Sequence, residues 1–265
     1  MNTRFSPNLI FKDIHKRWWL TTILMLIGGL FGLIFSTIKS PLFESKADFV
    51  ITIDYTRTGF LSDIDQDQAM LGIGSLLNSD DVLRRTVKKA NDAGYPLTKE
   101  SFKQKISIER EGFTWSLRVR DHNAEIAAAL VNIWSEEANS VYQTAAEHAV
   151  KANAYFTYLD SVVSCFQRAI TTYQNDYLCS LNNLEYISEE IEATGEIAYQ
   201  EKVASQGLMP ALTAQLVEKG QIQEKPVLFN RNGLILAGSV VGLVAAFLIH
   251  LLDHDRQIFH GKRTQ

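Results

Sequence analysis

The chain has 265 residues, a formal net charge of −4 and a hydrophobic fraction of 46%. Residues 18–38 and residues 233–252 contain no Asp, Glu, Lys or Arg. Each stretch is long enough to cross a bilayer as one helix, because about 30 Å of hydrocarbon at about 1.5 Å per residue requires about 20 residues. The two stretches exclude a soluble globular enzyme, and the negative net charge excludes a nucleic-acid binder that relies on a strongly basic surface.

Residues 1–17 are the predicted cytoplasmic N-terminus, and residues 18–38 the first transmembrane helix. Four basic residues and one acidic residue precede the helix, and an excess of Lys and Arg beside a span marks its cytoplasmic side. Trp18 and Trp19 suit the aromatic belt at that interface. A cleavable signal peptide is disfavoured, because the apolar stretch exceeds the roughly 7 to 15 residues of a signal-peptide core.

Residues 39–121 predict an α/β base next to the membrane on its outer face. Strands are expected at residues 47–53, 105–110 and 114–120, where polar and apolar residues alternate, with a hairpin turn at 111–113. Helices are expected at residues 66–77, 79–93 and 98–104. Ser79 or Asp80 and Thr98 are the predicted N-caps of the last two helices.

Residues 122–206 predict a long helical arm. This stretch contains no proline and a single glycine, Gly195. Apolar residues recur every three or four positions from Ala127 to Ile191, far beyond the average helix of about 11 residues. One long rod and a helical hairpin both fit this pattern. We favour an outgoing and a returning helix, because both flanking spans lie in the same membrane, and residues 207–232 are then the return segment.

Residues 233–252 predict the second transmembrane helix, and residues 253–265 a short cytoplasmic tail with three basic and two acidic residues. A buried core helix is the disfavoured alternative. The spans carry two Gly-x-x-x-Gly pairs, which permit close helix approach: Gly28 with Gly32, and Gly238 with Gly242. We predict that these glycines pack transmembrane helices, although glycine is also common in such helices without that role.

The net charge divides along the chain. Residues 39–232 sum to −8 and the two cytoplasmic ends to +4. Within the outer part, residues 80–120 hold ten basic and six acidic side chains, whereas residues 122–201 hold two basic and twelve acidic ones. A solvated helix face explains the acidic arm. The alternative is that the acidic arm faces the basic base of a neighbouring subunit in a ring.

The sequence indicates no catalytic residue, cofactor site or metal site. The six histidines form no metal-binding pair, and Gly72-Ile73-Gly74 lacks the third glycine of a nucleotide motif. His250 lies close to the cytoplasmic end of the second span, where interfacial snorkelling is the simpler account. Cys165 and Cys179 would lie ~21 Å apart on one helix, so a disulfide requires a hairpin turn between them and free thiols are expected.

Five stretches carry a family resemblance: WWL at 18–20, SPLFESKA at 40–47, NSDDVLRRTV at 78–87, VRDHNAEIAAALVN at 119–132 and KPV at 225–227. They include Pro41, Asn132 and Pro226. Their order across nearly the whole chain resembles that of the Wzz-type polysaccharide co-polymerases, the chain-length determinants of bacterial surface polysaccharides.

The resemblance implies an α+β membrane protein in which two transmembrane helices enclose an outer-face α/β base with a long helical arm. It implies a homo-oligomeric ring in the bacterial inner membrane, without catalysis of its own. Such a ring sets the length of an O-antigen, enterobacterial-type or exopolysaccharide chain made by a separate membrane-embedded polymerase, through contact with the polymerase or with the nascent polysaccharide.

Two other functions are considered. The chain is alternatively a membrane adaptor whose tail, residues 253–265, activates a separate cytoplasmic tyrosine kinase in capsule or exopolysaccharide export. A two-span sensor is disfavoured, because 13 residues after Leu252 are too few for a signalling module. The same count predicts that no kinase is fused to this chain.

Overall fold

The protein is described by a computed structural model over residues 18–172 and 184–261. These residues divide into two compact units. The first unit contains the two terminal helices together with residues 39–44, 121–124 and 223–230. The second unit contains residues 45–120 and 125–222.

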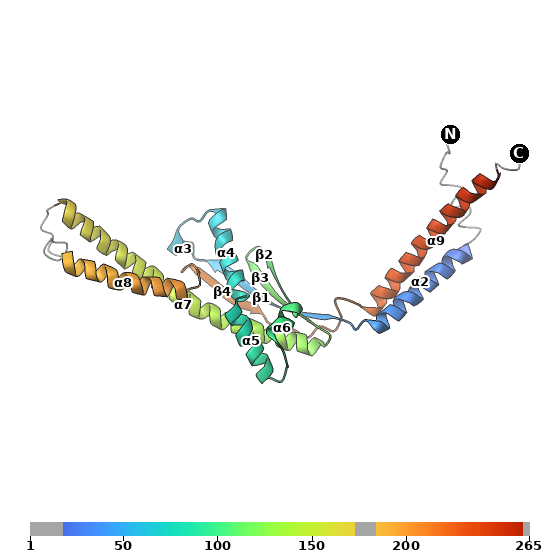
Figure 1. Ribbon diagram of the computed structural model, residues 1–265, viewed down its shortest axis with the longest axis horizontal. Coiled ribbons are helices and arrows are strands. Elements are labelled where there is room, and N and C mark those ends of the chain that lie inside the picture. The colour runs from blue at the N-terminus through green and yellow to red at the C-terminus, as the bar shows by residue number, and fades with distance from the viewer. Residues whose placement is uncertain (1–17, 173–183, 262–265) are drawn as a thin grey trace. The chain divides into compact units, whose positions relative to one another are not determined.

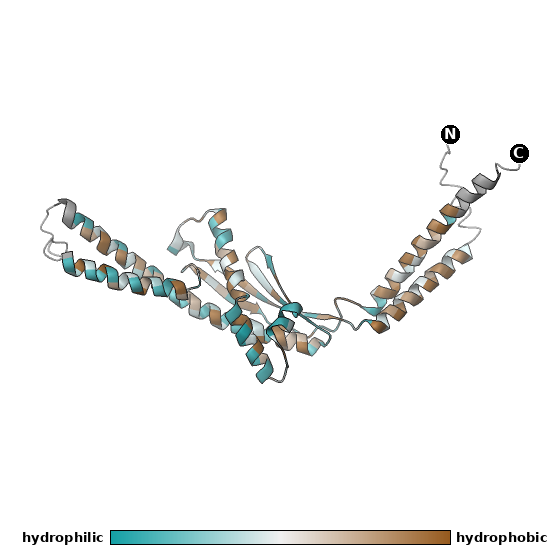
Figure 2. Ribbon diagram, in the orientation of Figure 1, coloured by the Kyte–Doolittle hydropathy of each residue, from teal (hydrophilic) through white to brown (hydrophobic). Residues whose placement is uncertain are grey.

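The first unit is a pair of helices, α2 (Trp18–Ile38) and α9 (Arg231–Gly261), which lie side by side (Figure 1). Both are long and apolar enough to span a membrane, α9 over residues 231–252 (Figure 2). Their hydroxyl groups donate to carbonyls of the same helix, as from Thr22 to Trp18 at 3.1 Å and from Ser239 to Ile235 at 3.0 Å. Such bonds satisfy hydroxyl groups that would find no hydrogen-bond partner in the hydrocarbon of a membrane.

The helix α9 extends beyond the predicted membrane span at both ends. The helix begins at Arg231 and continues past Leu252 to Gly261, so most of the predicted tail is helical. The apolar pattern identifies only the part of the helix that can span a membrane. The backbone can continue as a helix where the side chains are polar. Hydropathy therefore predicts the span and not the end of the helix.

The second unit contains a four-stranded sheet with the order β2-β3-β1-β4. The strands are β1 (Phe43–Ile53), β2 (Ile106–Glu111), β3 (Thr114–Asp121) and β4 (Leu212–Glu218). The pairs β1–β4 and β2–β3 are antiparallel. The turn between β2 and β3 contains Gly112 at φ 59°, a left-handed conformation that favours glycine.

Four short helices precede the β2–β3 hairpin: α3 (Tyr55–Thr58), α4 (Asp63–Leu77), α5 (Asp80–Asp92) and α6 (Lys99–Lys105). The predicted N-caps are confirmed for two of them. The Ser79 side chain accepts from the Val82 amide, and the Thr98 side chain accepts from the Ser101 amide within a capping box. Ser62 caps α4 in the same way, which is why this helix starts earlier than its apolar pattern predicted.

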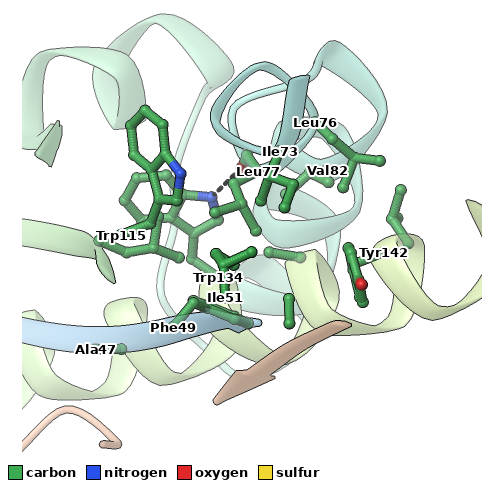
Figure 3. Packing of buried hydrophobic residues seen from close by; sticks show 14 of the residues in the cluster. Ala47, Phe49, Ile51, Ile73, Leu76, Leu77, Val82, Trp115, Trp134 and Tyr142 are labelled. Atoms are coloured by element: carbon green, nitrogen blue, oxygen red, sulfur yellow. Dashed lines mark hydrogen bonds between the residues drawn. The ribbon is translucent and has the colours of Figure 1, made fainter. Parts of the chain in front are cut away.

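The hydrophobic core of this unit lies between the sheet and its helices (Figure 3). Trp115, Leu117 and Val119 alternate with more exposed residues along β3 and are buried. A Cβ atom at Gly74 would overlap the Trp115 ring, so this glycine of α4 makes room for an aromatic side chain. Packing thereby accounts for one glycine of Gly72-Ile73-Gly74.

The arm consists of α7 (Ala124–Thr172) and α8 (Leu184–Ala204). Of the two alternatives, a rod or a hairpin, the structure has the hairpin (Figure 1). His148 Nδ1 lies 2.6 Å from Glu201 Oε2, and the Tyr158 hydroxyl donates to Glu190 Oε1 at 3.2 Å. Ten residues forward on α7 thus correspond to eleven back on α8, as antiparallel helices require. Near these contacts three alanines are buried: Ala149, Ala152 and Ala198.

Strand β4, like the one-turn helix α3, is an element that sequence reasoning missed. It lies inside the segment predicted only as a return to the membrane, and it pairs with β1 from Ile53↔Leu212 to Asp48↔Glu218. Leu212 and Ala214 are buried and Thr213 and Gln215 exposed, so a short period-two signal is present. An edge strand of seven residues with Thr and Gln on its outer side gives too weak a pattern to be recognised alone.

Candidate functional site

The four predicted packing glycines lie between α2 and α9 of the same chain. A Cβ atom at Gly28 would overlap the carbonyl oxygen of Gly238, and one at Gly238 would overlap that of Gly28. Gly32 and Gly242 approach the carbonyls of Leu234 and Leu24 equally closely. Side chains at these positions would force the two backbones apart, so glycine permits this contact.

The family-like prolines lie at one end of this helix pair, where the two chain segments outside the helices meet. The Leu42 amide donates to the Leu228 carbonyl at 3.1 Å, and the Val227 amide donates to the Leu42 carbonyl at 2.8 Å. Pro41 and Pro226 flank this isolated bridge, and neither has an amide hydrogen with which to extend it. His122 Nδ1 donates to the Pro41 carbonyl at 3.0 Å.

Asn132, the third family-like residue, holds the segment that follows β4. Its amide nitrogen donates to the Gly220 carbonyl at 3.0 Å, and its amide oxygen accepts from the Gly220 amide at 2.7 Å. A Cβ atom at Gly220 would overlap Val131 Cγ1 and lie 2.9 Å from Ser45 Oγ. Only glycine fits here, and the asparagine supplies both partners that this stretch of backbone needs.

Replacing Asn132 with alanine is expected to lower the free energy of unfolding by about 1–3 kcal/mol, because two hydrogen bonds to partly buried backbone groups are lost. The measurement is denaturant unfolding of the purified full chain in detergent, followed through the native tryptophans. Asn153→Ala, at an exposed position of the same helix, is the matched control and should change the value by no more than about 0.5 kcal/mol. Equal effects of the two variants would contradict the role given to Asn132.

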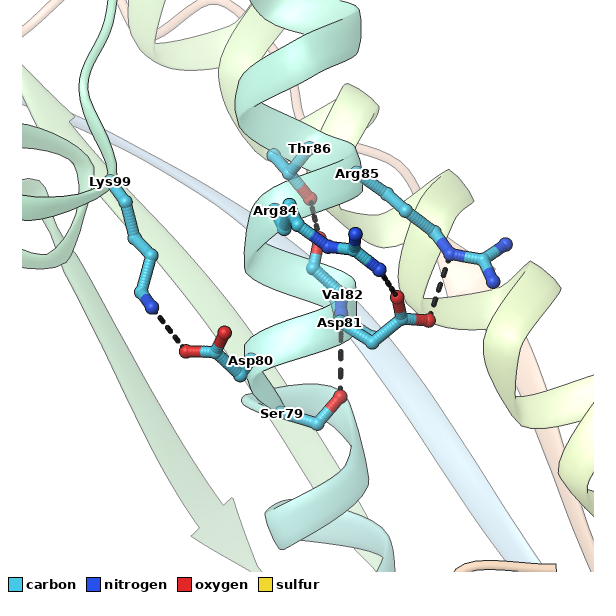
Figure 4. Close-up of polar contacts among 8 residues, drawn as sticks. All are labelled: Ser79, Asp80, Asp81, Val82, Arg84, Arg85, Thr86 and Lys99. Atoms are coloured by element: carbon cyan, nitrogen blue, oxygen red, sulfur yellow. Dashed lines mark hydrogen bonds and ion pairs between the residues drawn. The ribbon is translucent and has the colours of Figure 1, made fainter. Parts of the chain in front are cut away.

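The segment at residues 78–87 is a helix start held by ion pairs (Figure 4). Asp81 accepts from Arg84 at 2.7 Å and from Arg85 at 2.8 Å, and Asp80 accepts from Lys99 of α6. The hydrogen bond from Arg84 is the main cause that lowers the pKa of Asp81. Carboxylates in a first turn also complement the positive end of the helix. The segment therefore fixes where α5 begins.

Part of the attraction between basic base and acidic arm is satisfied within one chain. Lys89 of α5 lies 3.1 Å from both Glu136 and Glu137 of α7, and Lys219 lies 3.4 Å from Glu136. The hydrogen bond from Lys89 is the main cause that lowers the pKa of Glu136. Each pair contains a lysine that is about half exposed or more, so each contributes no more than about 1 kcal/mol. Contact between the arm and a neighbouring subunit stays a prediction.

An open groove of about 550 Å³ lies between α7 and the start of β4. Its lining combines the charged residues Arg57, Glu147 and Lys151 with the apolar Val150 and Leu212. At its floor the buried Tyr142 hydroxyl donates to the Leu212 carbonyl at 2.7 Å, and burial raises the pKa of this tyrosine. The bond anchors β4 to the arm helix.

Two expectations about single residues are wrong. Cys165 is disulfide-bonded and not a free thiol, whereas Cys179 lies outside the described residues. His250 is buried, with its Nε2 atom 3.5 Å from the Thr21 hydroxyl, so its ring lies against α2 and does not snorkel. Within the described part of the chain, no group of three or more His, Cys, Asp or Glu side chains is placed to hold a metal ion.

No family model matches the sequence, and no curated protein matches it. Among solved structures, a full-length bacterial polysaccharide co-polymerase is similar at 10% identity over 96% of this chain and 98% of that chain, with a TM-score of 0.40. A mutant of the Shigella flexneri lipopolysaccharide O-antigen chain-length regulator WzzBSF is 9% identical over 70% and 99%, with a TM-score of 0.25. A fragment of WzzB, the polysaccharide co-polymerase of Salmonella Typhimurium, is 13% identical over 70% and 98%, with a TM-score of 0.28. These three solved structures similar to this chain are polysaccharide co-polymerases and Wzz chain-length regulators.

Proposed function

We propose that this protein regulates the chain length of a bacterial surface polysaccharide as a co-polymerase. It acts as a homo-oligomeric ring in the inner membrane, with both termini cytoplasmic, beside a separate polymerase that makes the glycosidic bonds. The observation that carries the proposal is the order of elements along the chain. One continuous segment contains both a sheet and a helical arm, and it lies between two helices that are long and apolar enough to span a membrane. The order of the five family-like stretches supports the same function.

The arm suits a measuring role because its main helix is long and continuous. At about 1.5 Å per residue, the 49 residues of α7 extend about 74 Å. Three tyrosines of the arm, Tyr158, Tyr186 and Tyr199, are 47–69% exposed. Exposed aromatic rings pack against the apolar faces of sugars while their hydroxyls stay hydrated. We propose that arms side by side in a ring present such rings to the growing chain or to its polymerase.

Deletion of the gene is expected to abolish the modal length distribution of the surface polysaccharide. The measurement is a gel of polysaccharide from the deletion strain, from the parent and from the deletion strain supplied with the intact gene. Without its regulator the polymerase should give a broad distribution, and the intact gene should restore the modal band. An unchanged profile in the deletion strain would refute chain-length regulation.

A membrane adaptor for a cytoplasmic tyrosine kinase is the second candidate. The observation that favours it is the continuation of α9 beyond its apolar part to Gly261, which gives a partner a helical surface to bind. Deletion of residues 253–265 separates the two functions. Loss of kinase phosphorylation would support the adaptor, and unchanged phosphorylation with altered polymer length would support the regulator.

A further inference from the structure

Four exposed apolar side chains gather at the end of the helix pair where α2 ends and α9 begins. Ile38 is the last residue of α2, and Val227, Leu228 and Phe229 precede α9. Their exposed fractions are 70%, 53%, 44% and 36%. We call these four residues the collar. All of them belong to the first unit.

The antiparallel packing of the helices places the collar residues at the same end of the pair. Gly28 faces Gly238, and Gly32 faces Leu234, so four residues forward on α2 correspond to four back on α9. Continued to the first residue of α9, the same correspondence brings Phe35 level with Arg231, so Ile38 and residues 227–229 all lie beyond that level. The bridge between Leu42 and Leu228 ties the two segments together there. Because the 21 residues of α2 extend about 31 Å, the collar begins where the hydrocarbon of a bilayer ends.

The backbone of Phe229 is held in an uncommon conformation. Its φ is 57°, in the left-handed region that bulky residues rarely adopt. The chain on one side is fixed by the Leu42 bridge, and on the other the Asn230 carbonyl accepts from the Leu234 amide of α9. Backbone strain of this kind persists only where its surroundings determine it. The phenyl ring is thereby left exposed directly beside a membrane helix and outside the core.

Three exposed basic residues flank the collar: Lys39, Lys225 and Arg231. Lys39 follows Ile38, while Lys225 and Arg231 stand on either side of the apolar run. Glu224 is the one acidic residue between positions 223 and 231. Basic side chains next to a membrane surface attract anionic lipid headgroups, and apolar side chains next to them enter the boundary between headgroups and acyl chains.

We propose that the collar is a docking surface for lipid. It contacts the outer leaflet of the membrane that α2 and α9 span. Ile38, Val227, Leu228 and Phe229 enter the headgroup boundary, and the three flanking basic residues bind acidic phospholipid headgroups. The partner is a lipid surface, because the collar lies at the ends of two helices suited to a membrane and basic residues flank it. The proposal rests on the two-pass topology given above and is independent of chain-length regulation.

The test uses the full chain in lipid nanodiscs with an environment-sensitive fluorophore on single introduced cysteines. Leu228→Cys reports on the collar, and Val227→Cys is a second position should the first variant fail to fold. Val217→Cys on β4, which is 66% exposed, is the matched apolar control, and Ile34→Cys, which is 47% exposed, reports on the span. Labelling of the unsubstituted chain is subtracted. The nanodiscs contain phosphatidylcholine with or without phosphatidylglycerol, and lipids carrying a spin-label quencher near the headgroup or deep in the acyl chain.

We expect quenching at position 228 by the headgroup quencher several-fold stronger than at position 217, and stronger with phosphatidylglycerol. Replacing the three flanking basic residues with glutamine should remove the effect of phosphatidylglycerol. If position 34 is quenched by the deep label while position 228 behaves like position 217, the collar proposal is overturned. Quenching at 228 that is the same in both lipids overturns the headgroup assignment. An unquenched position 34 refutes the topology itself, a failure distinct from that of the collar.

Discussion

Replacing Gly238 with leucine is expected to separate α2 from α9. Any side chain at this position overlaps the backbone carbonyl of Gly28, and a backbone cannot turn aside as a flexible side chain can. Overpacking a well-fitted interior costs about 1–3 kcal/mol, and the rigid obstacle here places the change at the upper end of that range. The measurement is oxidative crosslinking in membranes between cysteines introduced at Leu24 and Ala245, which line one groove between the two helices.

Gly233→Leu is the matched control on the same helix. A Cβ atom at Gly233 meets no atom closer than 4.0 Å, so the added side chain should fit and crosslinking should persist. If Gly238→Leu crosslinks as well as the parent, the packing argument fails. The oligomeric state of the detergent-extracted protein is measured alongside. A smaller oligomeric state than that of the parent, with crosslinking intact, would assign the glycine to a contact between chains.

Replacing Trp134 with alanine is expected to lower the free energy of unfolding by about 3–5 kcal/mol, the range for truncating a large buried aromatic residue. The Trp134 ring has no exposed surface and meets the Phe102 ring edge-on, with centroids 5.7 Å apart. Its indole nitrogen donates to the Leu77 carbonyl at the end of α4, at 3.1 Å (Figure 3). The variant therefore loses packing and leaves a buried carbonyl without its donor.

Two further variants identify the cause. Trp134→Phe keeps most of the volume and removes the donor, so it should cost less than the alanine variant. Tyr199→Ala, at a position 63% exposed on the arm, should change the free energy of unfolding by no more than about 0.5 kcal/mol. Denaturant unfolding of the full chain in detergent, followed by circular dichroism, measures all three. A cost near that of Tyr199→Ala would show that Trp134 is not part of the core.

Local patterns explain most of the elements that the sequence predicted. Alternation along β1 and β3 reflects one buried face of a sheet, and Ser79 and Thr98 are side chains that satisfy the first amides of a helix. Strand β4 has no comparable local signal, because its pairing with β1 depends on residues about 160 positions earlier. The long apolar stretches identify α2 and α9, because about 20 apolar residues in a row are what a membrane-spanning helix requires. They do not predict where α9 ends.

The candidate site likewise contains residues that a local pattern predicts and residues whose contacts lie far away in the sequence. The spacing of Gly28, Gly32, Gly238 and Gly242 predicts close approach, and the structure places all four between the two helices. Asn132 enters only through the family resemblance, since its bonds to Gly220 join residues 88 positions apart. The free state expected of Cys165 is wrong because a distance along one helix says nothing about a chain that turns back.

The helix that forms the arm is also the one that lies in the core. Within its first turns α7 carries Trp134 and Asn132, and farther along it carries the contacts to α8 at His148 and Tyr158. No proline and no glycine interrupts it over its 49 residues. Because α7 is continuous, a force applied to the arm would be transmitted along this helix to the core residues that pack against the sheet. The arm is in this sense a lever, and a force on it would be transmitted to the hydrogen bonds between Asn132 and Gly220.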